Sequence, residues 1–162
     1  MIRAVLAVAY WALPMAAAGP EIEKAWIGAD GQVQVQSGGK IKSLAKDPDQ
    51  VSVQALVIAP DRQSVGWLVE MPNCCTSYPI PMTLVIHRAG QKPLRLGGSG
   101  LAIWGWAFRT NGSQVGFYTG TVHGDYTPNF QLHDTRTVRL IDTWVGREEL
   151  VAPEWARGLK PR

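Results

Sequence analysis

Two adjacent cysteines, Cys74 and Cys75, are the residues whose type and spacing most clearly allow chemistry in this sequence. Neighbouring Cα atoms lie about 3.8 Å apart across a trans peptide bond, whereas disulfide-linked residues usually lie about 4.4–6.8 Å apart. A disulfide between them would therefore distort the peptide and would be easily reduced. Three roles stay open: a structural staple or pair of buried thiols, a small apolar platform for a ligand, and soft-metal or intermolecular disulfide chemistry.

His123 and Asp125 form the second candidate group. An imidazole near a carboxylate could bind a metal ion or act as a general base. Zinc sites usually need three or four ligands, and only the two cysteines could add one here. Glycines flank His123 as in an ordinary hairpin loop, so we predict no metal site and no cofactor.

Motifs of common enzymes are missing from the sequence. It contains no Gly-x-Ser-x-Gly elbow, no P-loop, no Cys-x-x-Cys and no His-Glu-x-x-His. We therefore nominate no catalytic residue, and the sequence favours a protein that is not an enzyme.

The first 18 residues have the order of a secretory signal peptide: Arg3, an apolar run over residues 4–18, and small residues before a cleavage point after Ala18. The alternative is an N-terminal membrane anchor, but the run is short for a span of about 20 residues. We predict export to the periplasm or the exterior, with no membrane span after cleavage. Cleavage would lower the formal charge from +3 to +2, and this small, scattered charge argues against a nucleic-acid partner.

The remaining residues, 19–162, fit a single domain by length. Their apolar stretches are short, often alternate with polar residues and end at turn residues, which predicts strands. No stretch has the pattern of an amphipathic helix. The expected strands are residues 24–27, 32–36, 41–45, 51–58, 65–70, 83–87, 93–96, 103–108, 115–121, 130–134 and 138–144, followed by a C-terminal strand within 150–158.

An internal repeat relates two groups of these strands to each other. The stretch from Val57 to Val69 reads as strand, tight turn and strand, and it returns fifty residues later from Ala107 to Thr119. Repeats of this length are typical of solenoids, propellers and other arrays. The sequence thus predicts an all-β fold of four-stranded antiparallel meanders, with units at about 24–50 (partial), 51–98 and 99–147.

The turn in this repeat resembles the opening of a blade in the TolB-type, WD-repeat-like β-propeller family. That family has a Ser-Pro-Asp-Gly turn followed by an Ile-Ala-Phe/Trp strand. Ala59-Pro60-Asp61-Arg62 followed by Val65-Gly66-Trp67 is similar, with alanine for serine and arginine for glycine. The second copy keeps Gly112 but has Thr110 for proline. The resemblance covers residues 51–144 best, and it implies a propeller-like fold that binds partners.

The number of units does not determine whether the predicted propeller closes into a ring. Propellers typically have four to eight blades, and this chain has material for about three. The partial first unit lacks a fourth strand, which the C-terminal strand could supply. We expect a partial or open propeller-like monomer, with a β-sandwich-like stack and a six-bladed homodimer as alternatives.

Loops 71–81 and 120–129 occupy equivalent positions in the two full units, so they should lie on one rim of the fold. Binding residues often lie on loops held by a rigid scaffold. The leading hypothesis is an exported, non-enzymatic binding or scaffold module that holds a protein partner or small ligand on this rim. The alternatives are a redox or soft-metal protein that uses both cysteines and His123, and a structural envelope component. The candidate ligand-binding residues are Asn73, Cys74, Cys75, Tyr78, His123, Asp125 and Tyr126.

Overall fold

The computed structural model describes residues 19–73, 77–97, 100–123, 127–147 and 150–159. The predicted signal peptide lies outside these ranges. So do four of the candidate site residues, which are Cys74, Cys75, Asp125 and Tyr126.

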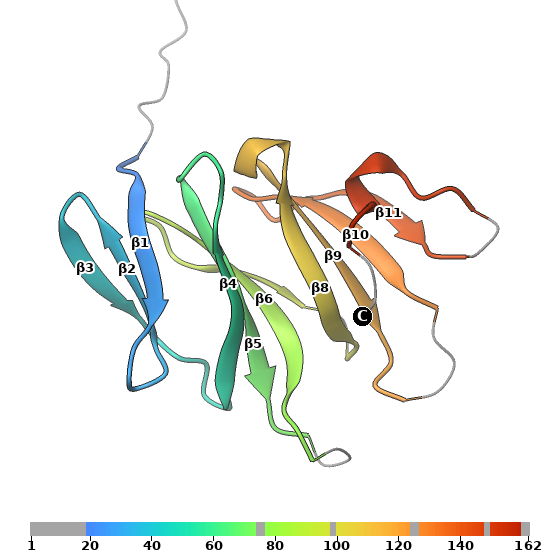
Figure 1. The fold of residues 1–162 in the computed structure, drawn as a ribbon, viewed down its shortest axis with the longest axis horizontal. Helices are drawn as coiled ribbons and strands as arrows, with labels where there is room; N and C mark the ends of the chain where they lie inside the picture. Colours follow the sequence, from blue (N-terminus) through green and yellow to red (C-terminus); the bar gives the residue numbers. More distant parts are fainter. Residues whose placement is uncertain (1–18, 74–76, 98–99, 124–126, 148–149, 160–162) are drawn as a thin grey trace, which may run out of the picture.

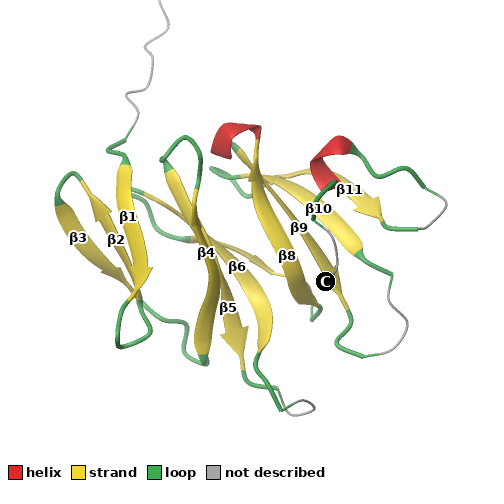
Figure 2. Ribbon diagram, in the orientation of Figure 1, coloured by secondary structure: helices red, strands yellow, loops and turns green. Residues whose placement is uncertain are grey.

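The described chain is all-β, as predicted, and forms three antiparallel sheets in which neighbours along the chain pair (Figures 1 and 2). The first sheet contains β1 (Ile22–Ile27), β2 (Val33–Ser37) and β3 (Lys40–Leu44). The second contains β4 (Ser52–Ile58), β5 (Ser64–Met71), β6 (Ile80–Arg88) and β7 (Leu94–Gly97). The third contains β8 (Ala102–Arg109), β9 (Gln114–Gly120), β10 (Asn129–Asp134) and β11 (Leu140–Val145). The sheets do not close into a ring.

The strand register confirms the fifty-residue repeat. Val57 pairs with Gly66 in the second sheet, and Ala107 pairs with Gly116 in the third. The two opening turns differ, because the second forms a short 3-10 helix, η1 (Thr110–Gly112). The two copies therefore share strand pairing and differ in the turn that joins the strands.

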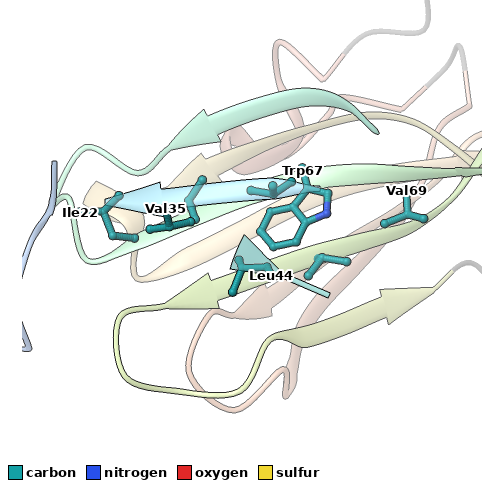
Figure 3. Close-up of a cluster of buried hydrophobic side chains, with 8 residues drawn as sticks. Ile22, Val35, Leu44, Trp67 and Val69 are labelled. Atoms are coloured by element: carbon teal, nitrogen blue, oxygen red, sulfur yellow. The ribbon is translucent and has the colours of Figure 1, made fainter. Parts of the chain in front are cut away.

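The middle sheet is covered on both faces, and this explains the continuous apolar run of β5. Successive side chains of a strand point to opposite faces, so Trp67 and Val69 face the first sheet while Leu68 faces the third. Figure 3 shows Trp67 and Val69 on the side of β5 that meets Val35 and Leu44 of the first sheet. The first core consists of Ile22, Val33, Val35, Leu44, Val65, Trp67, Val69 and Val85. The second core, between the second and third sheets, consists of Leu68, Leu84, Ile86, Leu96, Ile103, Val115 and Phe117.

The C-terminal segment corrects one prediction. Residues 150–159 form no strand and do not complete the first sheet; they form irregular structure around a 3-10 helix, η2 (Glu154–Ala156). Ala156 and Leu159 instead pack against Tyr118 and Phe130 on the outer face of the third sheet. That face is apolar and has no further sheet to cover it, so burial of its side chains favours this position.

The outer face of the first sheet needs no such cover. Trp26 lies opposite Gln34, and Lys24 lies opposite Gln36, so this face is mainly polar. The sheets thus form an open row with a polar face at one end and a covered apolar face at the other. Repeat proteins need comparable end caps for solubility.

Gly66 and Gly116, which occupy equivalent positions in the two units, provide a matched test of packing. A Cβ atom on Gly66 would lie 2.6 Å from Cη2 of Trp106 and 2.9 Å from Cδ1 of Ile86. Gly66→Ala should therefore lower the free energy of unfolding by about 1–3 kcal/mol, measured by urea denaturation. Gly116→Ala should cost less, because its nearest neighbour is the flexible end of Leu159 at 3.1 Å. Equal losses in the two variants would contradict this packing.

Candidate functional site

The two predicted loops lie at the same end of the row of sheets. The β5–β6 and β9–β10 connections both emerge at the lower edge of Figure 1. This arrangement follows from the meander, in which β5 and β9 run in the same direction through neighbouring sheets. The scaffold therefore places the described parts of loops 71–81 and 120–129 at one end of the row of sheets, as predicted.

The described candidate residues differ in their surroundings. Tyr78 is half exposed and lines a groove between the second and third sheets. Asn73 is half-buried at the start of the same loop. His123 is exposed on the β9–β10 connection, and it is not among the residues that line this groove. The structure thus connects Tyr78, but not His123, to this groove.

The groove has a volume of about 540 Å³ and follows the edge strands β4 and β8. It reaches from the β5–β6 loop to Gly158 and Leu159 of the C-terminal segment. The sequence pattern did not predict this groove; the Trp-Gly-Trp sequence at 104–106, which lies on the edge strand β8, was the available signal. The described side chains that line the groove include Gln54, Leu68, Glu70, Tyr78, Pro79, Trp104 and Trp106.

Both edge strands carry an irregularity at the groove. The register of β4 shifts between Gln54 and Val57, and that of β8 shifts between Ile103 and Gly105. Ala55, within the first of these shifts, has a left-handed backbone with φ 52°. Bulges interrupt the row of backbone groups on an edge strand and twist it away from further pairing. The groove therefore presents mainly side chains to a ligand.

The aromatic groups of the groove leave hydrogen-bonding capacity unused. The indole Nε1 atoms of Trp104 and Trp106 are buried and have no hydrogen-bond partner in the part of the chain that the structure describes. A buried donor without an acceptor is costly. The Ser52 hydroxyl donates a hydrogen bond to the Glu70 carboxylate at the same site. At the groove the tryptophan rings offer aromatic surfaces and Glu70 offers a carboxylate, which suit binding by stacking and hydrogen bonds.

His87 and His133 occupy equivalent positions in the two full units. His87 lies opposite Val65, and His133 lies opposite Val115. His87 is 2% exposed and faces the first core; burial, helped by the charge of Lys42, lowers its pKa from 6.5 to about 4. Both histidines are part of the scaffold, and neither lines the groove.

The described residues also bear on two other types of site, metal centres and membrane spans. No group of three or more histidine, cysteine, aspartate or glutamate side chains lies close enough together to hold a metal ion within the described ranges. None of the helices in those ranges is long and apolar enough to span a membrane.

Comparison with known proteins adds no relative. No protein-family model matches the chain, and no curated protein matches it. The likeness to TolB-type blades therefore stays a resemblance of short turns and strands, and the chemistry of the site rests on its own residues.

Proposed function

We propose that this protein is an exported, non-enzymatic binding or scaffold module of open, propeller-like form. Its protein or small-molecule ligand binds at the rim of loops 71–81 and 120–129 and extends into the groove beside β4 and β8. The groove carries this proposal, because it joins Tyr78 and Pro79 of the first loop to the tryptophans of β8.

The size and lining of the groove support a ligand site. Ligand pockets typically measure about 300–1,000 Å³ and combine apolar walls with a few polar groups, and this groove measures about 540 Å³. Trp104 and Trp106 provide flat surfaces for stacking, while Gln54 and Glu70 provide the polar groups that fix orientation. Among the described residues, the lining of the groove includes no cysteine, serine or histidine. The redox alternative depends on Cys74 and Cys75, which lie outside the described residues.

The groove is tested by a ligand-observed NMR screen of indole, sugar and short-peptide fragments against the purified protein. Fragments that bind the wild type should lose most of their signal with Tyr78→Ala and Trp104→Ala. Trp26→Ala is the matched control, since Trp26 lies on the outer face of the first sheet. Tyr78 is 50% exposed, so its truncation should leave the fold intact. Hits that survive both groove substitutions, or a screen without hits, would refute the proposal.

Export is tested separately. The protein expressed from its full gene in a bacterial host should be recovered from the periplasm or the medium with an intact mass that begins at Gly19. A cytoplasmic protein that retains residues 1–18 would contradict export without affecting the groove. The double variant Cys74→Ala, Cys75→Ala should still fold and bind the fragments, whereas loss of a bound metal ion or of a redox signal would favour the alternative.

A further inference from the structure

A second cavity lies on the opposite face of the third sheet from the second core. Its volume is about 460 Å³, and the C-terminal segment forms one of its walls. The sheet side contributes Pro128, Phe130 and Trp144, and the C-terminal side contributes Ala152, Ala156 and Leu159. The cavity and the groove share only Gly158 and Leu159, so they are separate sites.

The walls of this cavity are apolar. Phe130 is 5% exposed, and its ring centroid lies 4.8 Å from that of Trp144. Gly146 lets the walls approach closely, because a Cβ atom there would lie 2.8 Å from Cγ of Pro128. Apart from Arg157, every described residue that lines the cavity is apolar or a glycine. An apolar body is therefore the part of a ligand that this cavity would hold.

Arg157 is the one cation among the described residues that line the cavity, and its side chain forms a hydrogen bond within the site. Nε of Arg157 donates a hydrogen bond of 3.1 Å to the carbonyl oxygen of Ala152, another lining residue. No carboxylate in the described part of the chain forms an ion pair with Arg157. The nearest turn contains Glu154, which is exposed and is not among the lining residues. Arginine matches a carboxylate well, because its planar fork can donate two parallel hydrogen bonds.

We propose that this cavity binds an amphiphilic carboxylate, such as a fatty acid or an arene carboxylic acid. The apolar body lies between the Phe130–Trp144 pair and the C-terminal segment, and the carboxylate pairs with Arg157. Among the described lining residues Arg157 is the one cation beside apolar walls, and this charge complementarity selects an amphiphilic carboxylate over neutral or cationic amphiphiles. This site does not depend on the groove or on the function proposed for it.

Three probes of equal chain length test the proposal on the full mature chain: decanoate, decanol and decyltrimethylammonium, each below its micelle concentration at neutral pH. Decanoate should bind at least about tenfold more tightly than decanol, since a charge-assisted hydrogen bond contributes about that much. The cationic probe should bind most weakly. Isothermal titration calorimetry gives the affinities, and quenching of tryptophan fluorescence reports contact with Trp144.

Variants test whether Arg157 causes the preference for decanoate over decanol. Arg157→Gln should reduce decanoate affinity to that of decanol, while Arg157→Lys, which keeps the charge but loses the fork, should retain part of the preference. Arg136→Gln is the matched control, because Arg136 lies in the exposed β10–β11 turn. Ala152→Phe should weaken all three probes by filling the cavity. Equal binding of decanoate and decanol, no binding by either, or a preference that survives in Arg157→Gln overturns the proposal.

Discussion

Acidification from pH 6.5 to pH 4 should cost this protein roughly 3 kcal/mol of folding free energy through His87 alone. Burial and the charge of Lys42 lower the pKa of His87 from 6.5 to about 4 in the folded protein. As the pH falls, the unfolded chain therefore takes up the proton first. The contribution of His87 is complete above about pH 6.5 and decreases until about pH 4. Urea denaturation at a series of pH values measures this loss.

Substitution of His87 separates its contribution to the loss of stability from that of the carboxylates, which also take up protons in acid. His87→Leu should remove most of the loss between pH 6.5 and pH 4, and it should cost little at pH 7. The Nδ1 atom of His87 is buried without a partner among the described residues, and replacing such a group by an apolar one of similar size is nearly neutral. His123→Gln is the control; it leaves His87 in place and should keep the wild-type profile. A wild-type profile in His87→Leu would show that His87 does not cause the loss.

Asp134 responds to acid in a lower pH range. Partial burial acts to raise its pKa, but hydrogen bonds from Thr137 and from the N–H of Arg136, together with the charge of Arg139, lower it below 3.8 overall. Its contribution is therefore present above its ordinary pKa and is lost only as the pH falls below that value. The two residues thus affect stability in adjacent pH ranges.

Removal of the Arg109 side chain should weaken the packing of the C-terminal segment, residues 150–159, against the outer face of the third sheet. Nε of Arg109 donates to the carbonyl oxygen of Trp155 at 2.7 Å, and a terminal nitrogen donates to that of Arg157 at 3.0 Å. Burial lowers the pKa of this guanidinium below its usual value, yet it stays charged at neutral pH. Arg109→Met leaves two carbonyl groups without these donors, so we expect a loss of about 2–3 kcal/mol in the free energy of unfolding.

Amide hydrogen exchange and urea denaturation test this expectation together. The amides of Ala156 and Leu159 bond to the carbonyl oxygens of Pro153 and Ala156, and they should exchange faster in Arg109→Met, while amides of the first core change little. Arg136→Met is the matched control, because it shortens an arginine in an exposed turn. Unchanged exchange at the C-terminal segment would contradict the role of Arg109.

The C-terminal segment on the outer face of the third sheet also bears on how two copies of the chain could form a homodimer. A six-bladed homodimer would need to pack another sheet against the outer face of the third sheet, where Ala156 and Leu159 already lie. In the described part of the chain β11 is an edge strand, and its Leu140 and Val145 are exposed. The homodimer stays a prediction.

Much of the fold follows from the sequence. Short apolar stretches between turn residues gave the eleven expected strands of the three meanders, because local alternation and turn residues determine strand position and pairing with the next strand. The fifty-residue offset further predicted the shared register of Gly66 and Gly116. A strand pattern in the C-terminal segment was misleading, since its position depends on an apolar face formed by distant residues.

For the candidate sites, too, the sequence predicts some features and only the tertiary structure shows the others. The sequence alone determined which loops share a rim, because chain direction in a meander fixes the end at which each loop emerges. Only the tertiary structure brought Tyr78 into a groove with Trp104 and Trp106, and placed Arg157 beside the Phe130–Trp144 pair. Those groups come from different sheets or from the C-terminal segment, and packing between sheets depends on side-chain shape and burial. Local sequence patterns encode pairing within a sheet, but they do not encode which faces and edges meet.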